Sequence, residues 1–138
     1  MTADETLLNK WLAERLNGEL SGILRVEAPP TDVVHLPEVW GLVHFVAGDE
    51  LVPGNRTVRH EGELSVCVPP GYEGVSREVF ASARAALDRV LAEMCVQSFV
   101  SVGGGGVYVY EARVNGARTG VEDGAWKLSV DFTLVVQY

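Results

Sequence analysis

Apolar residues recur every three or four positions between Ser76 and Gln97, the clearest pattern in the chain. This spacing predicts an amphipathic helix of about five turns, because 3.6 residues complete one turn. Ser76 is the expected N-cap, since Pro69, Pro70 and Gly71 before it cannot be helical. The helix must pack its apolar stripe on another element. The stripe comprises Val79, Phe80, Ala83, Ala86, Leu87, Val90, Leu91, Met94 and Cys95.

A second helix is predicted over Thr2 to Leu20, where Thr2 and Glu5 match a capping box. Asn17-Gly18 is expected to end it, because both residues tolerate a left-handed cap. Trp11 is expected to anchor this helix in the core. The apolar side of the helix comprises Leu7, Leu8, Trp11, Leu12 and Leu16.

Short alternating or apolar runs predict five strands. The strand at 126–137 has the cleanest alternation, with apolar side chains on one side and polar ones on the other. The strand at 40–46 is apolar on both sides, which predicts a central, covered strand. The predicted strands are Ile23–Glu27, Trp40–Val46, Glu63–Val68, Val107–Val114 and Trp126–Gln137.

Two connecting stretches stand out. Ala47 to Gly62 combines alternating charges with many turn residues, so a β-hairpin arm, an ordered binding loop and a mobile surface loop all fit. Asn115 to Gly124 is predicted to be a long polar loop that joins the last two strands as an antiparallel hairpin. The last strand would be about 36 Å long, and such a strand at a sheet edge invites pairing with another chain.

These elements predict one α+β domain over residues 1–138: a single mostly antiparallel sheet with two helices packed on one face, in the order α-β-β-β-α-β-β. The chain is 47% hydrophobic, enough for a core in a domain of this size, and no apolar run is long enough for a membrane span. The acidic N-terminal stretch lacks the basic region of a signal peptide, which favours a cytoplasmic origin. Cys67 and Cys95 are then expected to be buried, reduced thiols.

The net charge is −8, and the basic residues are scattered. Tight nucleic-acid binding requires a basic patch, so this composition disfavours it. An acidic surface instead suits solubility, or a surface past which DNA slides without sticking.

No motif predicts catalysis, a cofactor or a metal. Gly103 to Gly106 follows a predicted helix rather than preceding one, so it is expected to be a flexible helix-to-strand connection and not a phosphate loop. His35, His44 and His60 lack metal-ligand spacing, and His60 is expected in a loop. His44 is expected to be a half-buried strand residue. An enzyme is therefore the weaker hypothesis.

The order of elements is similar to that of a known protein family. The chain resembles the tail-terminator, or tail-completion, proteins of long-tailed bacteriophages. The N-terminal helix at 7–20, the strand–turn–helix unit of Leu64 to Gln97 with its Pro-Pro-Gly turn, and the tryptophan-led final strand at 126–136 are similar to that family's elements.

The resemblance implies a homohexameric ring at the head-proximal end of the tail, with no catalysis. Its expected partners are further copies of itself, the tail-tube protein and a head–tail connector protein, and DNA would pass through the channel without specific binding. The protein would assemble in the host cytoplasm and reside in the virion tail. Candidate contacts to neighbouring subunits or to the tube lie on the two polar connections: Asp49, Glu50, Arg56, Arg59, Arg118, Glu122 and Asp123.

Three alternatives remain open. The protein could be a different neck or minor tail protein, since these share similar folds. It could also be a small-ligand-binding domain or an enzyme with a pocket between helices and sheet, which predicts converging polar groups there. A third, weaker option is an adaptor that pairs with another protein by strand addition.

Overall fold

A long antiparallel sheet is the centre of the fold in the computed structural model, which describes residues 3–29 and 39–138. Its strands are β1 (Arg25–Glu27), β2 (Trp40–Val52), β3 (Thr57–Val68), β4 (Phe99–Val102), β5 (Gly105–Glu122) and β6 (Ala125–Gln137). They lie in the order β1-β2-β3-β6-β5-β4. All neighbours are antiparallel except β1 and β2. The predicted α+β class is confirmed, with β4 added after the second helix.

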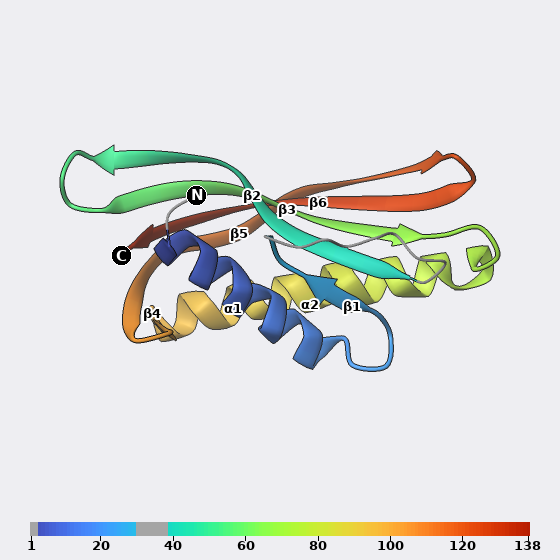
Figure 1. Ribbon diagram of the computed structural model, residues 1–138, viewed down its shortest axis with the longest axis horizontal. Helices are drawn as coiled ribbons and strands as arrows, with labels where there is room; N and C mark the ends of the chain where they lie inside the picture. The colour runs from blue at the N-terminus through green and yellow to red at the C-terminus, as the bar shows by residue number, and fades with distance from the viewer. Residues whose placement is uncertain (1–2, 30–38) are drawn as a thin grey trace.

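Both helices, α1 (Ala3–Glu19) and α2 (Ser76–Gln97), lie on the same face of the sheet (Figure 1). The predicted stripe of α2 faces the core: Val79, Ala83, Leu87, Val90 and Met94 are all buried. They meet the apolar side of β6, where Leu128, Val130, Phe132, Leu134 and Val136 are buried as the alternation predicted. Trp11 is partly buried and packs against this core.

The ends of the helices differ in part from the prediction. Ser76 is the first helical residue rather than the N-cap, because a short 3-10 turn at Glu73–Val75 precedes it and Val75 takes the cap position without a side-chain bond. α1 continues through Asn17 and Gly18 to Glu19. The predicted capping residue Thr2 lies outside the described residues.

Asn17 does not end its helix; its side chain binds the backbone of β1. Its Oδ1 accepts from the Val26 N–H at 2.6 Å, and its Nδ2 donates to the Val26 carbonyl at 2.8 Å. The side chain therefore satisfies the backbone groups of β1 much as another strand would.

The two long connections turn out to be parts of long strands. β2 continues to Val52 and β3 begins at Thr57, so the hairpin-arm interpretation of Ala47 to Gly62 is confirmed. The polar loop predicted at Asn115 to Gly124 is wrong: β5 continues to Glu122, and only a tight turn at Asp123 and Gly124 remains. We call these the β2–β3 arm (residues 46–61) and the β5–β6 arm (residues 115–128).

The glycine run is another correction. Ser98, in the left-handed conformation, ends α2, and Gly103 to Gly106 forms the turn and first residues of the β4–β5 hairpin instead of a flexible connection. β2 is also less central than predicted. It has β1 beside it only at Trp40 to Leu42, and the sheet face bearing Leu42 and His44 is half-buried.

Candidate assembly surfaces

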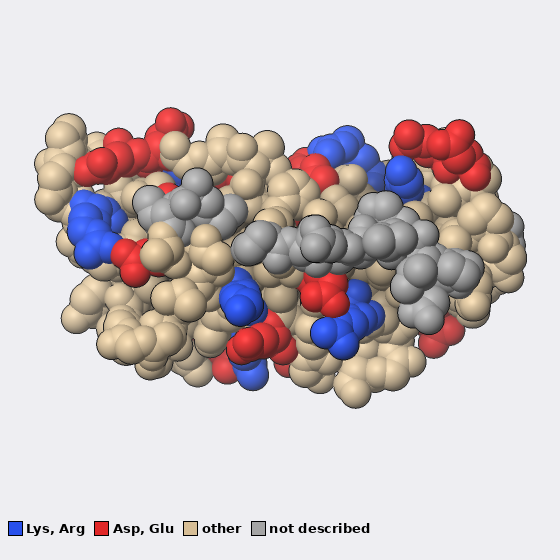
Figure 2. Space-filling model, in the orientation of Figure 1, with Lys and Arg blue, Asp and Glu red and all other residues tan. Residues whose placement is uncertain are grey.

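The seven predicted contact residues separate into two groups on the two arms, which extend from opposite ends of the sheet (Figure 1). Acidic side chains gather over both arms, at the upper left and upper right of the surface (Figure 2). The β2–β3 arm carries Asp49, Glu50, Arg56 and Arg59, and the β5–β6 arm carries Arg118, Glu122 and Asp123.

The β2–β3 arm has a well-specified tip. Gly54 and Arg56 adopt positive φ angles of 85° and 62°, and the Gly54 N–H donates to the Glu50 carboxylate at 2.7 Å. Asp49 lies opposite Arg59 in the β2–β3 ladder. These contacts form a turn whose charged side chains are exposed.

Contacts with the helix layer and with the C-terminal strand hold this arm in place. The Arg56 guanidinium pairs with Asp4 at the start of α1. The Arg56 carbonyl accepts from the Tyr138 N–H at 3.1 Å, and the Gln137 side chain donates to the Asn55 carbonyl at 3.1 Å. The arm therefore projects as an extension of the sheet, with ties on two sides.

His60 stands at the base of this arm, within β3 and buried, rather than in the predicted loop. Its ring stacks on Phe45 at a centroid distance of 4.3 Å, and its Nε2 lies 2.6 Å from the Tyr138 hydroxyl. Burial lowers the pKa of His60 and raises the pKa of Tyr138. Both shifts favour the neutral forms, so the pair is an uncharged hydrogen bond inside the arm's base.

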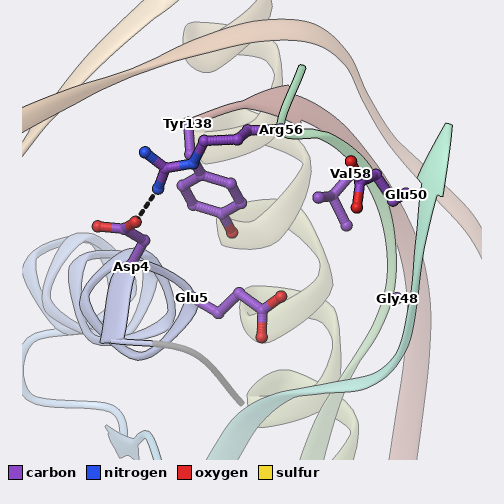
Figure 3. Close-up of a pocket in the computed structure, with 7 residues that line it drawn as sticks. All are labelled: Asp4, Glu5, Gly48, Glu50, Arg56, Val58 and Tyr138. Atoms are coloured by element: carbon purple, nitrogen blue, oxygen red, sulfur yellow. Dashed lines mark hydrogen bonds and ion pairs between the residues drawn. The ribbon is translucent and has the colours of Figure 1, made fainter. Parts of the chain in front are cut away.

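A hollow of about 310 Å³ lies between the start of α1 and the β2–β3 arm (Figure 3). Arg56 extends past the ring of Tyr138 to reach Asp4, and Glu5 points toward the space between helix and arm (Figure 3). Glu50 and Val58 line the opposite side. This hollow is the place in the fold that the ligand-binding alternative would use.

On the β5–β6 arm, Arg118 joins three strands. Its guanidinium contacts Asp131 on β6 and, at 3.2 Å, Glu63 on β3, and these contacts raise its pKa. Near the tip, Lys127 pairs with Glu122 at 2.9 Å. Three of the seven predicted contact residues, Arg56, Arg118 and Glu122, thus form ion pairs within their own chain.

The sheet face opposite the helices carries a ladder of polar contacts. Thr133 donates to Glu61 at 2.9 Å and accepts from Asn115 at 2.7 Å, and Asn115 also accepts from Arg113 at 2.6 Å. On the same face Glu63 and Asp131 lie opposite each other in the β3–β6 ladder, and Arg118 contacts both. The outward-facing positions of 126–137 predicted this polar face, but not its partners.

Exposed apolar side chains on both arms and on β5 were missed from the sequence. Val46 is 63% exposed, Tyr110 is 62% exposed and Val121 is 57% exposed. Val121 interrupts a polar stretch, but Val46 ends an apolar run and Tyr110 follows one, and strand patterns alone do not tell which side of a strand is covered.

The structure shows where the residues that could support chemistry lie. They contain no group of three or more His, Cys, Asp or Glu side chains placed to hold a metal ion. Cys67 is buried as expected, and burial raises its pKa, but Cys95 is exposed because it lies at the edge of the apolar stripe of α2. His44 is half-buried in β2, as predicted, but its buried Nδ1 has no hydrogen-bond partner among the described residues, whereas a satisfied ring was expected. Within the described part of the chain, no helix has the length and apolarity to cross a membrane.

Comparisons with known proteins identify a fold. No protein-family model and no curated protein sequence matches the chain. Among solved structures, a chain described as part of the virion of a native gene transfer agent particle aligns with a TM-score of 0.52 at 14% identity. The alignment covers 89% of this chain and 84% of that one. A second solved chain aligns over 99% of this chain and 92% of its own length, at 18% identity and a TM-score of 0.50. At these identities the likeness establishes a shared fold.

Proposed function

We propose that this protein is a structural component of a phage-like particle, and in particular a tail terminator. Six copies would form a ring at the head-proximal end of the tail, stop growth of the tail tube and present a surface to the head. The main support is the fold that the chain shares, over 89% of its length, with a chain from a gene transfer agent virion. The proposed role requires no catalysis.

The two arms suit such an assembly. A ring of identical chains is built from one contact repeated around an axis, in which two different surfaces of each copy meet. The β2–β3 and β5–β6 arms extend from opposite ends of one sheet, so each copy has a separate projection for each neighbour or for the tube (Figure 1). We assign Asp49, Glu50, Arg59, Glu122 and Asp123 to these contacts, with Arg56 and Arg118 supporting the arms from within.

The remaining partners follow from this role. The ring would bind the tail-tube protein on one side and a head–tail connector protein on the other. DNA would pass through the centre, and a chain of net charge −8 without a basic run would not retain it. The protein would be assembled in the host cytoplasm and remain in the virion tail. A neck or minor tail protein is the next most closely supported role, because it would use the same fold and arms.

Arm-shortening variants test this proposal. One variant joins Gly48 to His60 through an Asn-Gly turn and removes the tip of the β2–β3 arm. The other joins Thr119 to Leu128 in the same way. Each pair lies directly opposite in its ladder, so a two-residue turn can close the shortened hairpin.

Each variant should stay folded but lose the ability to cap tail tubes, because the charged arm tip assigned to contacts is missing. Folding is checked by circular dichroism and melting, and assembly by light scattering and by electron microscopy of tubes made with the particle's tube protein. A variant with Arg84→Ala and Asp88→Ala, both on α2 and outside the arms, is the control. Normal rings and capped tubes from both shortened variants would refute the proposed role of the arms.

Ligand binding in the hollow beside α1 is the second candidate, favoured by Asp4, Glu5, Glu50 and Arg56 lining one small space. Titrating the protein with small charged metabolites, while recording its NMR chemical shifts, distinguishes ligand binding from assembly. Saturable shifts confined to residues around this hollow, from a chain that forms no oligomer, would favour binding over assembly.

A further inference from the structure

Two strands of the sheet have long stretches with a neighbour on one side only. Among the described residues, β1 pairs with β2 only from Trp40 to Leu42, and β4 pairs with β5 only from Gly105 to Tyr108. Beyond β4, Ser98 accepts from the Val109 N–H, and the Cys95 thiol lies 3.4 Å from the Ala112 carbonyl. Within the described residues, the edges without a neighbouring strand are therefore residues 43–52 of β2 and 113–122 of β5, each about 33 Å when extended.

The directions of these two edges match. β2 is antiparallel to β3, β3 to β6 and β6 to β5, so β2 and β5 run in opposite directions at opposite sides of one sheet. If a second copy is placed beside the first in the same orientation, its β2 lies against β5 as an antiparallel neighbour. The backbone groups of both edges can then form the ladder that each lacks.

Charge favours a particular alignment. Through Arg59 and Val135, the ladders place Asp49 level with Glu111, two residues from Arg113. An incoming β2 at that level would run into β4. A shift of about two residues along the strand moves it clear of β4 and brings Asp49 beside Arg113. Residues 43–49 of one copy then lie against 113–119 of the next.

Exposed apolar surface lies along the same edges. Val46 is 63% exposed on the β2 edge, and Val121 is 57% exposed near the end of the β5 edge. Both strands contain β-bulges, at Phe45/Ala47 and at Val114/Gly116. Bulges often protect edges from pairing, but they also bend a sheet, and a ring requires bent sheets.

We propose that copies of this chain join edge to edge, with residues 43–49 of β2 forming an antiparallel ladder with residues 113–119 of β5 in the next copy. This inference rests on the proposed ring and names its subunit contact. The contact uses two different surfaces, so it can close into a ring of a fixed number of copies. It would also extend the six-stranded sheet from one subunit to the next.

Cross-linking of two single-cysteine proteins tests this contact. Both start from a variant with Cys67→Ala and Cys95→Ala; one then carries Ala47→Cys and the other Gly116→Cys, because these two positions lie near each other on the same face of the proposed ladder. A short bis-maleimide is added to each protein alone and to an equal mixture, at concentrations where light scattering shows oligomers. The mixture should give a cross-linked dimer, and each protein alone should give little. Asp88→Cys on α2, mixed with either, is the control that should not cross-link.

The possible outcomes separate the two proposals. Oligomers without the mixed cross-link overturn the edge contact and leave the ring untouched. Equal cross-linking in the unmixed samples also overturns it, because like edges would then be meeting. A mixed cross-link in oligomers that do not cap tail tubes supports the contact and contradicts the tail-terminator role. A chain that is monomeric at every concentration, alone and on tails, contradicts both.

The charge pair offers an independent readout. Asp49→Arg alone and Arg113→Asp alone should each weaken association several-fold, because each places like charges side by side. The double variant should recover most of the loss. If the double variant weakens association by the product of the two single-variant factors, the proposed alignment is wrong.

Discussion

Replacing Gly62 with alanine tests how closely the base of the β2–β3 arm is packed. A methyl group at this position would place its carbon closer than 3.0 Å to three ring atoms of Phe132, a fully buried side chain on the neighbouring strand. Gly62 also lies opposite Phe45 in β2, whose ring stacks on His60. The ring of Phe132 therefore has little room to move.

The expected cost follows from this overlap. Overpacking of a closely packed core typically destabilises by about 1–3 kcal/mol. For 138 residues, an unfolding entropy of about 2.1 cal/mol/K per residue converts this to a fall in Tm of roughly 3–10 °C. Gly62→Ala should show this loss in both thermal and urea unfolding.

Two further variants make the prediction specific. Gly120→Ala is the matched control: it lies in β5, has open space around it and should change stability by less than about 0.5 kcal/mol. Phe132→Leu should relieve the overlap, so the double variant should be more stable than the two single losses predict. If Gly62→Ala is as stable as Gly120→Ala, or if the double variant is simply additive, the packing described for the arm base is incorrect.

Three other predictions concern single contacts. Burial lowers the pKa of His60, so the unfolded chain binds a proton more readily than the folded chain does. The free energy of unfolding should therefore fall as the pH drops below about 6.5. In unfolding measured from about pH 7.5 to about 5.5, His60→Gln should make this fall smaller. Cys95 is exposed, whereas Cys67 is buried and has a raised pKa. A maleimide should therefore label Cys95 quickly and Cys67 slowly, and Cys95→Ala should remove the fast phase. Two equal labelling rates would contradict this prediction. Asn17→Ala removes both bonds to Val26 and should cost about 1–3 kcal/mol, with faster hydrogen exchange at the Val26 amide; unchanged exchange would show that β1 does not depend on Asn17.

The sequence predicted best where one strong periodicity acted over a whole element. The stripe of α2 and the alternation of β6 each pointed to one buried face, and both faces are buried except at Cys95 on α2 and Trp126 on β6, which are exposed. Because hydrophobic burial is proportional to the area removed from water, such a pattern leaves few alternatives. The α+β class and the order of elements followed from these two.

The sequence was a weaker guide to the parts of the strands that extend beyond the core. Residues 115–122 are exposed, so no alternation marks them as a strand, and hydrogen bonds to β6 hold them there instead. His60 was expected in a loop because charged residues surround it, although its ring is covered by Phe45 and Tyr138. Contacts that join residues far apart in the chain, such as Arg56 with Asp4, leave no local signal.

The candidate assembly surfaces also include some features that the sequence predicted and others that it did not. The charged residues at the arm tips could be chosen from the sequence because turn residues and charges cluster there. The open edges of β2 and β5 could not, since their exposure depends on how short β1 and β4 are. An edge becomes visible only when the pairing of every strand is known.

The molar mass of the protein in solution tests the central claim most directly. Light scattering behind a sizing column, at several protein concentrations and two salt concentrations, measures it without a label. A stable species of six chains, about 89 kDa from 6 × 14.9 kDa, is the predicted result, and end-on images of that species should show a ring. A single species of 14.9 kDa at every concentration and salt, with no ring on tail tubes either, would contradict the self-assembly on which the proposed function rests.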